Sequence, residues 1–131
     1  MGQQQLLLLV LAVIIVGIAI VVGITMFNSQ AASSNLDGVT NDLMNLGSRA
    51  QQYYVRPTSM GGGGQTFAGM SIQHLTTQPT NENGTYTTTT GGQQIVITGV
   101  GVQDGDRNGT NCTATCTVFA NDSIKVAVTD R

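Results

Sequence analysis

The fold of this 131-residue chain is decided by residues 6–27, which read LLLLVLAVIIVGIAIVVGITMF. This stretch of 22 residues has no charged side chain, and the first ionisable side chain in the sequence is that of Asp37. As an α-helix it would rise about 33 Å, against a bilayer hydrocarbon core of about 30 Å. The stretch therefore predicts an apolar helix long enough to span a membrane.

The remaining composition limits the class of protein. The chain has 9% charged residues and a net charge of −2, and its few Lys and Arg residues are not clustered. Such a chain cannot neutralise a run of phosphates, so the composition argues against a nucleic-acid partner. The length leaves room for one small domain beyond the apolar segment.

The residues before the apolar stretch bear on how the chain begins. A cleaved secretory signal usually has a shorter apolar region of about 7–15 residues behind a basic segment, and here only Met1-Gly2-Gln3-Gln4-Gln5 precedes it. Membrane-inserted chains normally carry basic residues on the cytoplasmic flank. We therefore expect that a basic leader has been removed and that Met1 is a processed N-terminus. The alternative is that Met1 is the initiator.

A second helical pattern follows the polar residues 28–35. Its apolar positions step by three and four residues, as in one stripe of an amphipathic helix, and are Leu36, Val39, Leu43, Leu46, Ala50 and Tyr53. Pro57 disfavours helical geometry in the residue before it, so this helix should end at Val55 or Arg56. The stripe must pack against another part of the chain.

The two helical patterns are expected to form one uninterrupted rod. No proline precedes Pro57, and Gly17 and Gly23 each cost only about 1 kcal/mol relative to alanine. Unwinding in apolar surroundings would leave several backbone groups unpaired at several kcal/mol each. We therefore predict a continuous helix from about Leu6 to Tyr54, including inside an assembly.

Beyond Pro57 the pattern changes from helix to strand. The glycine run 61–64 is flexible by composition and cannot hold regular structure. Residues 86–90 and 93–100 flank Gly91-Gly92, which is typical of a β-hairpin with a primed turn. Residues 115–119 and 123–129 flank Ala120-Asn121-Asp122 and predict a second hairpin.

These elements predict an α+β fold. A long N-terminal α-helix, hydrophobic in its first half and amphipathic in its second, should pack on a small antiparallel β-sheet of three or four strands with a Thr-rich outer face. The expected division is a hydrophobic helix over 1–27, its amphipathic continuation over 28–56, and a Gly-rich loop with the β domain over 57–131.

This arrangement resembles a type IV pilin. The likeness is carried by Gln3-Gln4-Gln5, by the apolar run 6–27, by the amphipathic continuation ending in Gln51-Gln52-Tyr53-Tyr54, and by a short Gly- and Thr-rich β domain with a late Cys pair. It is specific in motif only over about the first 55 residues. The pilin family usually has Glu at the fifth mature position, and this chain has Gln5 there, or Leu7 if the mature chain begins at Gln3.

The resemblance implies a homopolymer. The subunit would be anchored in the inner membrane, trimmed by a prepilin peptidase and placed by a pilus assembly machinery into an extracellular surface filament. Helices bundled in the filament core would bury apolar side chains worth about 1.5–3 kcal/mol each. The expected core interface comprises Leu6, Leu7, Leu9, Val10, Val13, Ile14, Gly17, Ile20, Val21 and Ile24.

Two classes of function follow. The first is a structural filament subunit for adhesion, aggregation or motility. The second is a singly anchored protein with a small exported binding domain, which includes minor pilins and pseudopilins. The amphipathic stripe directly after the apolar run favours the first. Neither class is enzymatic, and the sequence offers no catalytic group, cofactor motif or metal-ligand set.

Two motifs near the C-terminus have alternative interpretations. Asp104, Asp106 and Asn108 match the first half of a calcium loop, but the closing acid is replaced by Thr115, so a turn is favoured over a calcium site. Cys112 and Cys116 in an exported protein predict a disulfide rather than free thiols or a metal site. A disulfide at this spacing requires a turn, because an extended strand would separate the residues by about 13 Å.

Two further features remain without a firm assignment. His74 has no Ser, Cys or carboxylate pattern around it, which favours a structural over a catalytic role. Asn83, Asn108, Asn111 and Asn121 each begin an Asn-x-Ser/Thr sequon, although such sequons arise readily by chance in a Thr-rich segment.

Overall fold

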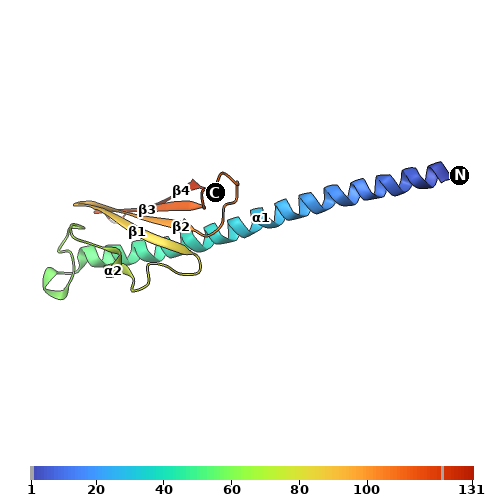
Figure 1. Ribbon diagram of the computed structural model, residues 1–131. Coiled ribbons are helices and arrows are strands. Elements are labelled where there is room, and N and C mark those ends of the chain that lie inside the picture. Colours follow the sequence, from blue (N-terminus) through green and yellow to red (C-terminus); the bar gives the residue numbers. More distant parts are fainter. Residues whose placement is uncertain (1, 122) are drawn as a thin grey trace.

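The structure, a computed structural model, describes residues 2–121 and 123–131. It consists of one long helix and one antiparallel sheet (Figure 1). The elements are α1 (Gly2–Val55), the 3₁₀ turn η1 (Thr58–Met60), α2 (Ile72–Leu75), β1 (Gly84–Gly91), β2 (Gln94–Gly101), β3 (Thr113–Phe119) and β4 (Ile124–Asp130). This confirms the predicted α+β class. Whether Met1 is the mature start, and the place of Asp122 in the second turn, lie outside the described residues.

Helix α1 is unbroken along its 54 residues, as predicted for the single chain. At 1.5 Å per residue it is about 81 Å long. Only its second half lies against the sheet, while the first half extends away from the domain (Figure 1). The polar residues 28–35 therefore continue the helix.

The glycine run after α1 is irregular, but it is held in place by hydrogen bonds. Gly63 N donates to Tyr53 O over 2.9 Å, and Gln65 N donates to Tyr54 O over 2.8 Å, so the run folds back over the C-terminus of α1. These bonds satisfy carbonyl groups that have no partner inside the helix. Gly64 has a φ of 60°, which a residue with a side chain rarely adopts.

The four strands pair in sequence order, β1-β2-β3-β4, and all neighbours are antiparallel. Gly91 pairs with Gln94, so the first turn consists of Gly92 and Gln93. The predicted turn at Gly91-Gly92 is therefore wrong by one residue. Neither Gly92 nor Gln93 has a positive φ, so the turn is not of the primed type either. The second hairpin, β3 to β4, forms where the sequence predicts it.

The two faces of the sheet differ in chemistry. Strands β2 and β3 alternate strictly between buried residues and partly or fully exposed ones. On the outer face Thr87 pairs with Thr98, and Thr98 pairs with Thr115. The outer face is thus rich in threonine, and the inner face carries the apolar side chains.

The core lies between the inner face of the sheet and the second half of α1. Val39, Leu43, Leu46 and Ala50 are buried, and Leu36 and Tyr53 pack at the edge of the same cluster. The sheet contributes five side chains of β2 and β3 and one of β1, namely Ile95, Ile97, Ala114, Cys116, Val118 and Tyr86. The segment between α1 and β1 adds three that the sequence did not single out, Phe67, Met70 and Leu75.

Two glycines allow the helix and the sheet to approach closely. A Cβ at Gly47 of α1 would lie 3.1 Å from Cys116 Sγ, and a Cβ at Gly99 of β2 would lie 2.8 Å from Val39 Cγ1. Side chains at these positions would therefore push α1 away from β2 and β3.

We predict that Leu43→Ala lowers the free energy of unfolding of the domain by about 2–5 kcal/mol, because Leu43 is fully buried and its loss leaves a cavity. The neighbouring Met44→Ala is a matched control, since Met44 is 47% exposed. Guanidinium unfolding of both variants in detergent measures the difference. Equal midpoints for Leu43→Ala and Met44→Ala would contradict this assignment of the core.

Candidate functional site

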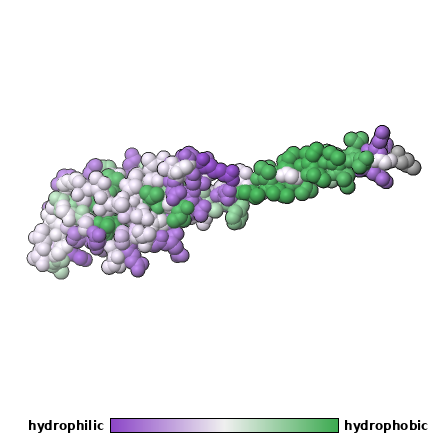
Figure 2. Space-filling model, in the orientation of Figure 1, coloured by the Kyte–Doolittle hydropathy of each residue, from purple (hydrophilic) through white to green (hydrophobic). Residues whose placement is uncertain are grey.

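The first half of α1 presents the expected interface residues to the surroundings. Apart from Gly17, their exposed fractions run from 52% at Ile14 to 69% at Leu7. Gly17 is exposed as well. The remaining members lie within these limits and are Leu6, Leu9, Val10, Val13, Ile20, Val21 and Ile24. The space-filling view shows this part of the helix as one continuous apolar surface (Figure 2).

The apolar surface encircles the helix and is wider than the predicted interface. Exposed apolar side chains that were not singled out are Leu8, Leu11, Ile15, Val16, Ile18, Val22, Met26 and Phe27. A helix that is hydrophobic all round has no preferred face. Sequence periodicity therefore could not separate interface from non-interface positions.

The apolar half satisfies its own polar groups. Thr25 has the one hydroxyl in residues 6–27, and this hydroxyl donates to Val21 O over 2.9 Å. A continuous helix also pairs its own backbone groups, as apolar surroundings require. By length and composition the segment is sufficient to cross a membrane.

Contact between α1 and the domain begins at Ala32, the first buried residue of the helix. A Cβ at Gly105 would lie 2.6 Å from Ala32 Cβ, so the loop after β2 touches the helix here. Everything before residue 31 is exposed along α1. The domain core is therefore complete without the apolar half of the helix.

Three polar residues fasten α1 to the segment before β1 and to β1 itself. Asn35 Nδ2 donates to Asn83 O over 2.7 Å, Asp42 accepts three side-chain bonds, and Arg49 Nη1 donates to Leu75 O over 2.7 Å. They recur every seven residues and so lie along one side of the helix. None of the three residues was predicted from the sequence, although their seven-residue spacing next to the apolar stripe was a usable signal.

Asp42 is the negatively charged residue of this row. Its Oδ2 accepts hydrogen bonds from Tyr86 Oη at 2.6 Å, Asn83 Nδ2 at 2.9 Å and Asn81 Nδ2 at 3.0 Å. Partial burial acts to raise the pKa of Asp42, but the three donors outweigh it and hold that pKa below the ordinary 3.8. The same burial and the neighbouring carboxylate raise the pKa of Tyr86.

The loop between β2 and β3 is a turn held by its own side chains. Asp104 Oδ2 accepts a bond from Gly109 N over 2.8 Å, and Asp106 Oδ1 accepts one from Asn108 N over 3.2 Å. Burial acts to raise the pKa of Asp104, but bonds from backbone N–H groups lower it overall. Among the described residues no group of three or more His, Cys, Asp and Glu side chains is arranged to hold a metal ion.

The predicted Cys112–Cys116 disulfide is wrong. Both cysteines are free and fully buried. Residues 113–119 run straight as β3, so no turn brings the two sulfurs together, and four extended residues span about 13 Å. Cys112 Sγ instead donates to Asn35 Oδ1 over 3.1 Å, while Cys116 packs in the core.

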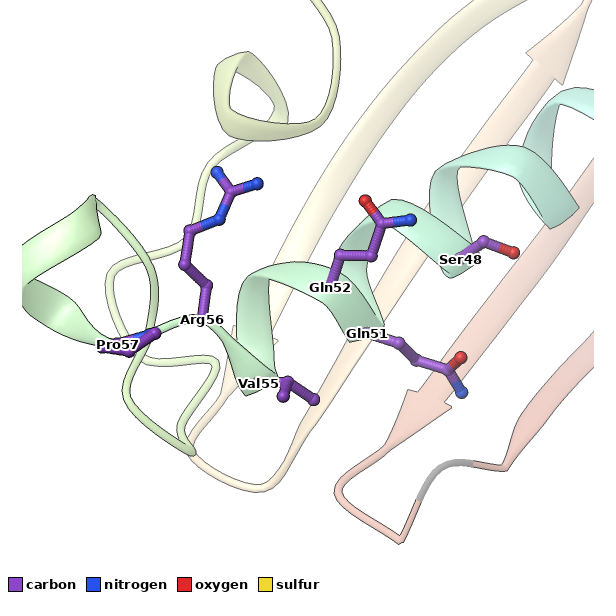
Figure 3. A pocket seen from close by; sticks show the side chains of 6 residues that line it. All are labelled: Ser48, Gln51, Gln52, Val55, Arg56 and Pro57. Atoms are coloured by element: carbon purple, nitrogen blue, oxygen red, sulfur yellow. The ribbon is translucent and has the colours of Figure 1, made fainter.

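Two other candidates have structural surroundings. His74 is exposed, and its Nδ1 accepts a bond from Ser71 N over 3.0 Å at the start of α2. A wide, shallow hollow lies at the C-terminus of α1, where the six lining side chains point in different directions (Figure 3). A ligand site needs polar groups that converge, and these do not.

No family model, curated protein or solved structure matches the chain.

We predict that Asp42→Asn lowers the free energy of unfolding by about 1–3 kcal/mol near neutral pH, because the hydrogen bonds to a carboxylate are lost. Since the pKa of Asp42 is depressed in the folded chain, its contribution is present above 3.8 and is lost as pH falls through the folded pKa. The difference between variant and parent should therefore shrink in acid. Unfolding curves across this pH range measure it. Asp37→Asn, on the exposed side of α1, is the control, and an equal effect there would contradict the role of Asp42.

The buried thiols make a separate prediction. Burial raises the pKa of the Cys116 thiol to about 11 and raises that of Cys112 as well. We expect neither thiol to react with iodoacetamide in the folded chain, and both to react in denaturant without any reductant. Mass spectrometry counts the added groups. Labelling that appears only after reduction would show instead that Cys112 and Cys116 form a disulfide.

Proposed function

We propose that the chain is a structural subunit of an extracellular type IV pilus-like filament. The observation that carries the proposal is the exposed apolar half of α1, which projects from a domain whose core is already complete. The same segment would anchor the subunit in the inner membrane before assembly. A prepilin peptidase and a pilus assembly machinery are the partners that the pilin resemblance implies, and adhesion, aggregation or motility are the roles it implies for the filament.

The energetics support self-association or membrane insertion of this segment. Removing an aliphatic side chain from water is worth about 1.5–3 kcal/mol, and the exposed apolar side chains together amount to on the order of tens of kcal/mol. No face of the β domain offers comparable apolar surface among the described residues. The unbroken helix favours a filament over a simple anchor, because a rod that enters the domain without a linker fixes the orientation of the domain.

A second candidate, a singly anchored minor pilin, pseudopilin or other membrane protein with an exported domain, requires the same apolar segment. Abundance separates the two. Filaments sheared from the cell surface should consist mainly of this chain if it is the major subunit, whereas a trace, cell-bound protein would indicate the second candidate.

Assembly should depend on the apolar half of α1. We predict that a chain beginning at Asn28 remains a folded monomer, because the first buried residue of α1 is Ala32 and the core cluster lies beyond it, while the full-length chain forms regular filaments when detergent is removed. Circular dichroism checks folding, and light scattering with electron microscopy checks assembly. Regular filaments formed by the shortened chain would disprove the helical-core proposal, as would failure of the full-length chain to form anything but amorphous aggregate.

A further inference from the structure

The tripeptide Asn-Gly-Thr occurs twice, at residues 83–85 and 108–110. In each copy the glycine lacks a side chain, so its backbone nitrogen can approach the amide carbon of the preceding asparagine with little hindrance. The two tripeptides are identical, although Glu82 precedes one and Arg107 precedes the other. A difference in their reactivity that disappears in urea would therefore come from the fold.

The copy at 108–110 lies in the exposed loop between β2 and β3. Asn108 Oδ1 accepts bonds from Thr110 N over 2.7 Å and from Thr110 Oγ1 over 2.6 Å. Gly109 N donates to Asp104 Oδ2 over 2.8 Å. Asn108 Nδ2 donates to Asp106 Oδ2 and Asp130 Oδ1, both over 3.0 Å.

These contacts fall on the three atoms that change in asparagine deamidation. The attacking nitrogen of Gly109 faces a carboxylate that can accept its proton. The amide oxygen of Asn108 faces two donors that stabilise negative charge developing on it, as in an oxyanion hole. The leaving nitrogen Nδ2 is held by two further carboxylates, which orient the amide plane.

We propose that Asn108 deamidates spontaneously, with Asp104 and Thr110 as the assisting groups. Gly109 N loses its proton to Asp104 and forms a bond to Asn108 Cγ, and Asp104 returns that proton through solvent to Nδ2, so that the Cγ–Nδ2 bond breaks and ammonia leaves. Water then opens the resulting succinimide at either carbonyl, which leaves aspartate or isoaspartate at position 108. The loop gains a fourth carboxylate beside those of Asp104, Asp106 and Asp130.

The copy at 83–85 is held in an unreactive state. Gly84 is the first residue of β1 and pairs with Gly101, and its N–H donates to Asn81 Oδ1 over 3.1 Å. Asn83 is tied to α1 through Asp42 Oδ2 at 2.9 Å and through Asn35 Nδ2 at 2.7 Å. The rotation needed for ring closure would break these contacts between the helix and the loop.

The test compares the two copies within one full-length chain. The purified protein in detergent is incubated at mildly alkaline pH, and the mass gain of each tryptic peptide is followed together with isoaspartate labelling. We expect Asn108 to react at least about tenfold faster than Asn83 in the folded chain, a barrier difference of about 1.4 kcal/mol, and both to react at similar rates in urea. Equal rates in the folded chain, or no conversion of Asn108, would overturn the proposal, as would cleavage of the chain after Asn108.

Substitutions at Thr110 distinguish assistance from simple exposure. Thr110→Val removes the Oγ1 donor and should slow Asn108 by about threefold or more, whereas Thr110→Ser retains the hydroxyl and should keep the parent rate. Slow reaction of Asn83 in both variants shows that the fold is intact. An unchanged rate in Thr110→Val would show that exposure alone controls the reaction, which contradicts the assisting role. The outcome is independent of whether the chain forms filaments.

Discussion

The packing of one stripe of α1 against β2 and β3 is the contact on which the domain depends. Among the described residues the sheet has a single layer, and the inner side chains of β2 and β3 are covered mainly by Val39, Leu43, Leu46 and Ala50. A lone meander of four strands would leave that face in water. Gly47 and Gly99 set how closely the two layers approach, and the hydrogen bonds of Asn35, Asp42 and Arg49 set where the loops meet the helix.

Because the same helix supplies the core and the exposed apolar segment, the two parts of the chain share one axis. Each residue of an α-helix turns the chain by about 100°. The direction in which the Thr-rich outer face points is therefore fixed relative to every side chain of residues 6–27. In the proposed filament, the rotational position of α1 in the core would decide which surface of the domain faces outward. No flexible linker would let the domain turn relative to the helix.

Local sequence signals accounted for most of the architecture. The spacing of Leu36 to Tyr53, the position of Pro57 and the alternation in the last 50 residues placed the helix, its end and the sheet, because each is a repeated pattern within one element. The contacts that the sequence did not reveal join distant segments, whereas the first turn and the disulfide were local patterns that the structure does not follow. The glycine run closes on carbonyls of α1, and the partner of Cys112 is Asn35, so neither contact is visible in the neighbouring residues. The disulfide prediction was wrong because β3 begins directly after Cys112, so the chain has no turn between the two cysteines.

The first half of α1 is apolar on all sides, which explains why the sequence could not show which side chains form an interface. The same property limits how much the hydrophobic effect can contribute to assembly. Lipid tails are as apolar as leucine, so moving residues 6–27 from a membrane into a bundle of identical helices gains little from the hydrophobic effect. The free energy that favours the helix bundle over the membrane must therefore come from close packing and from polar contacts. Gly17 and Gly23 have open space where a Cβ would lie, which permits neighbouring backbones to approach. Partner choice in the proposed filament would then depend on these two glycines and on the polar surface of residues 28–55, more than on any single apolar side chain.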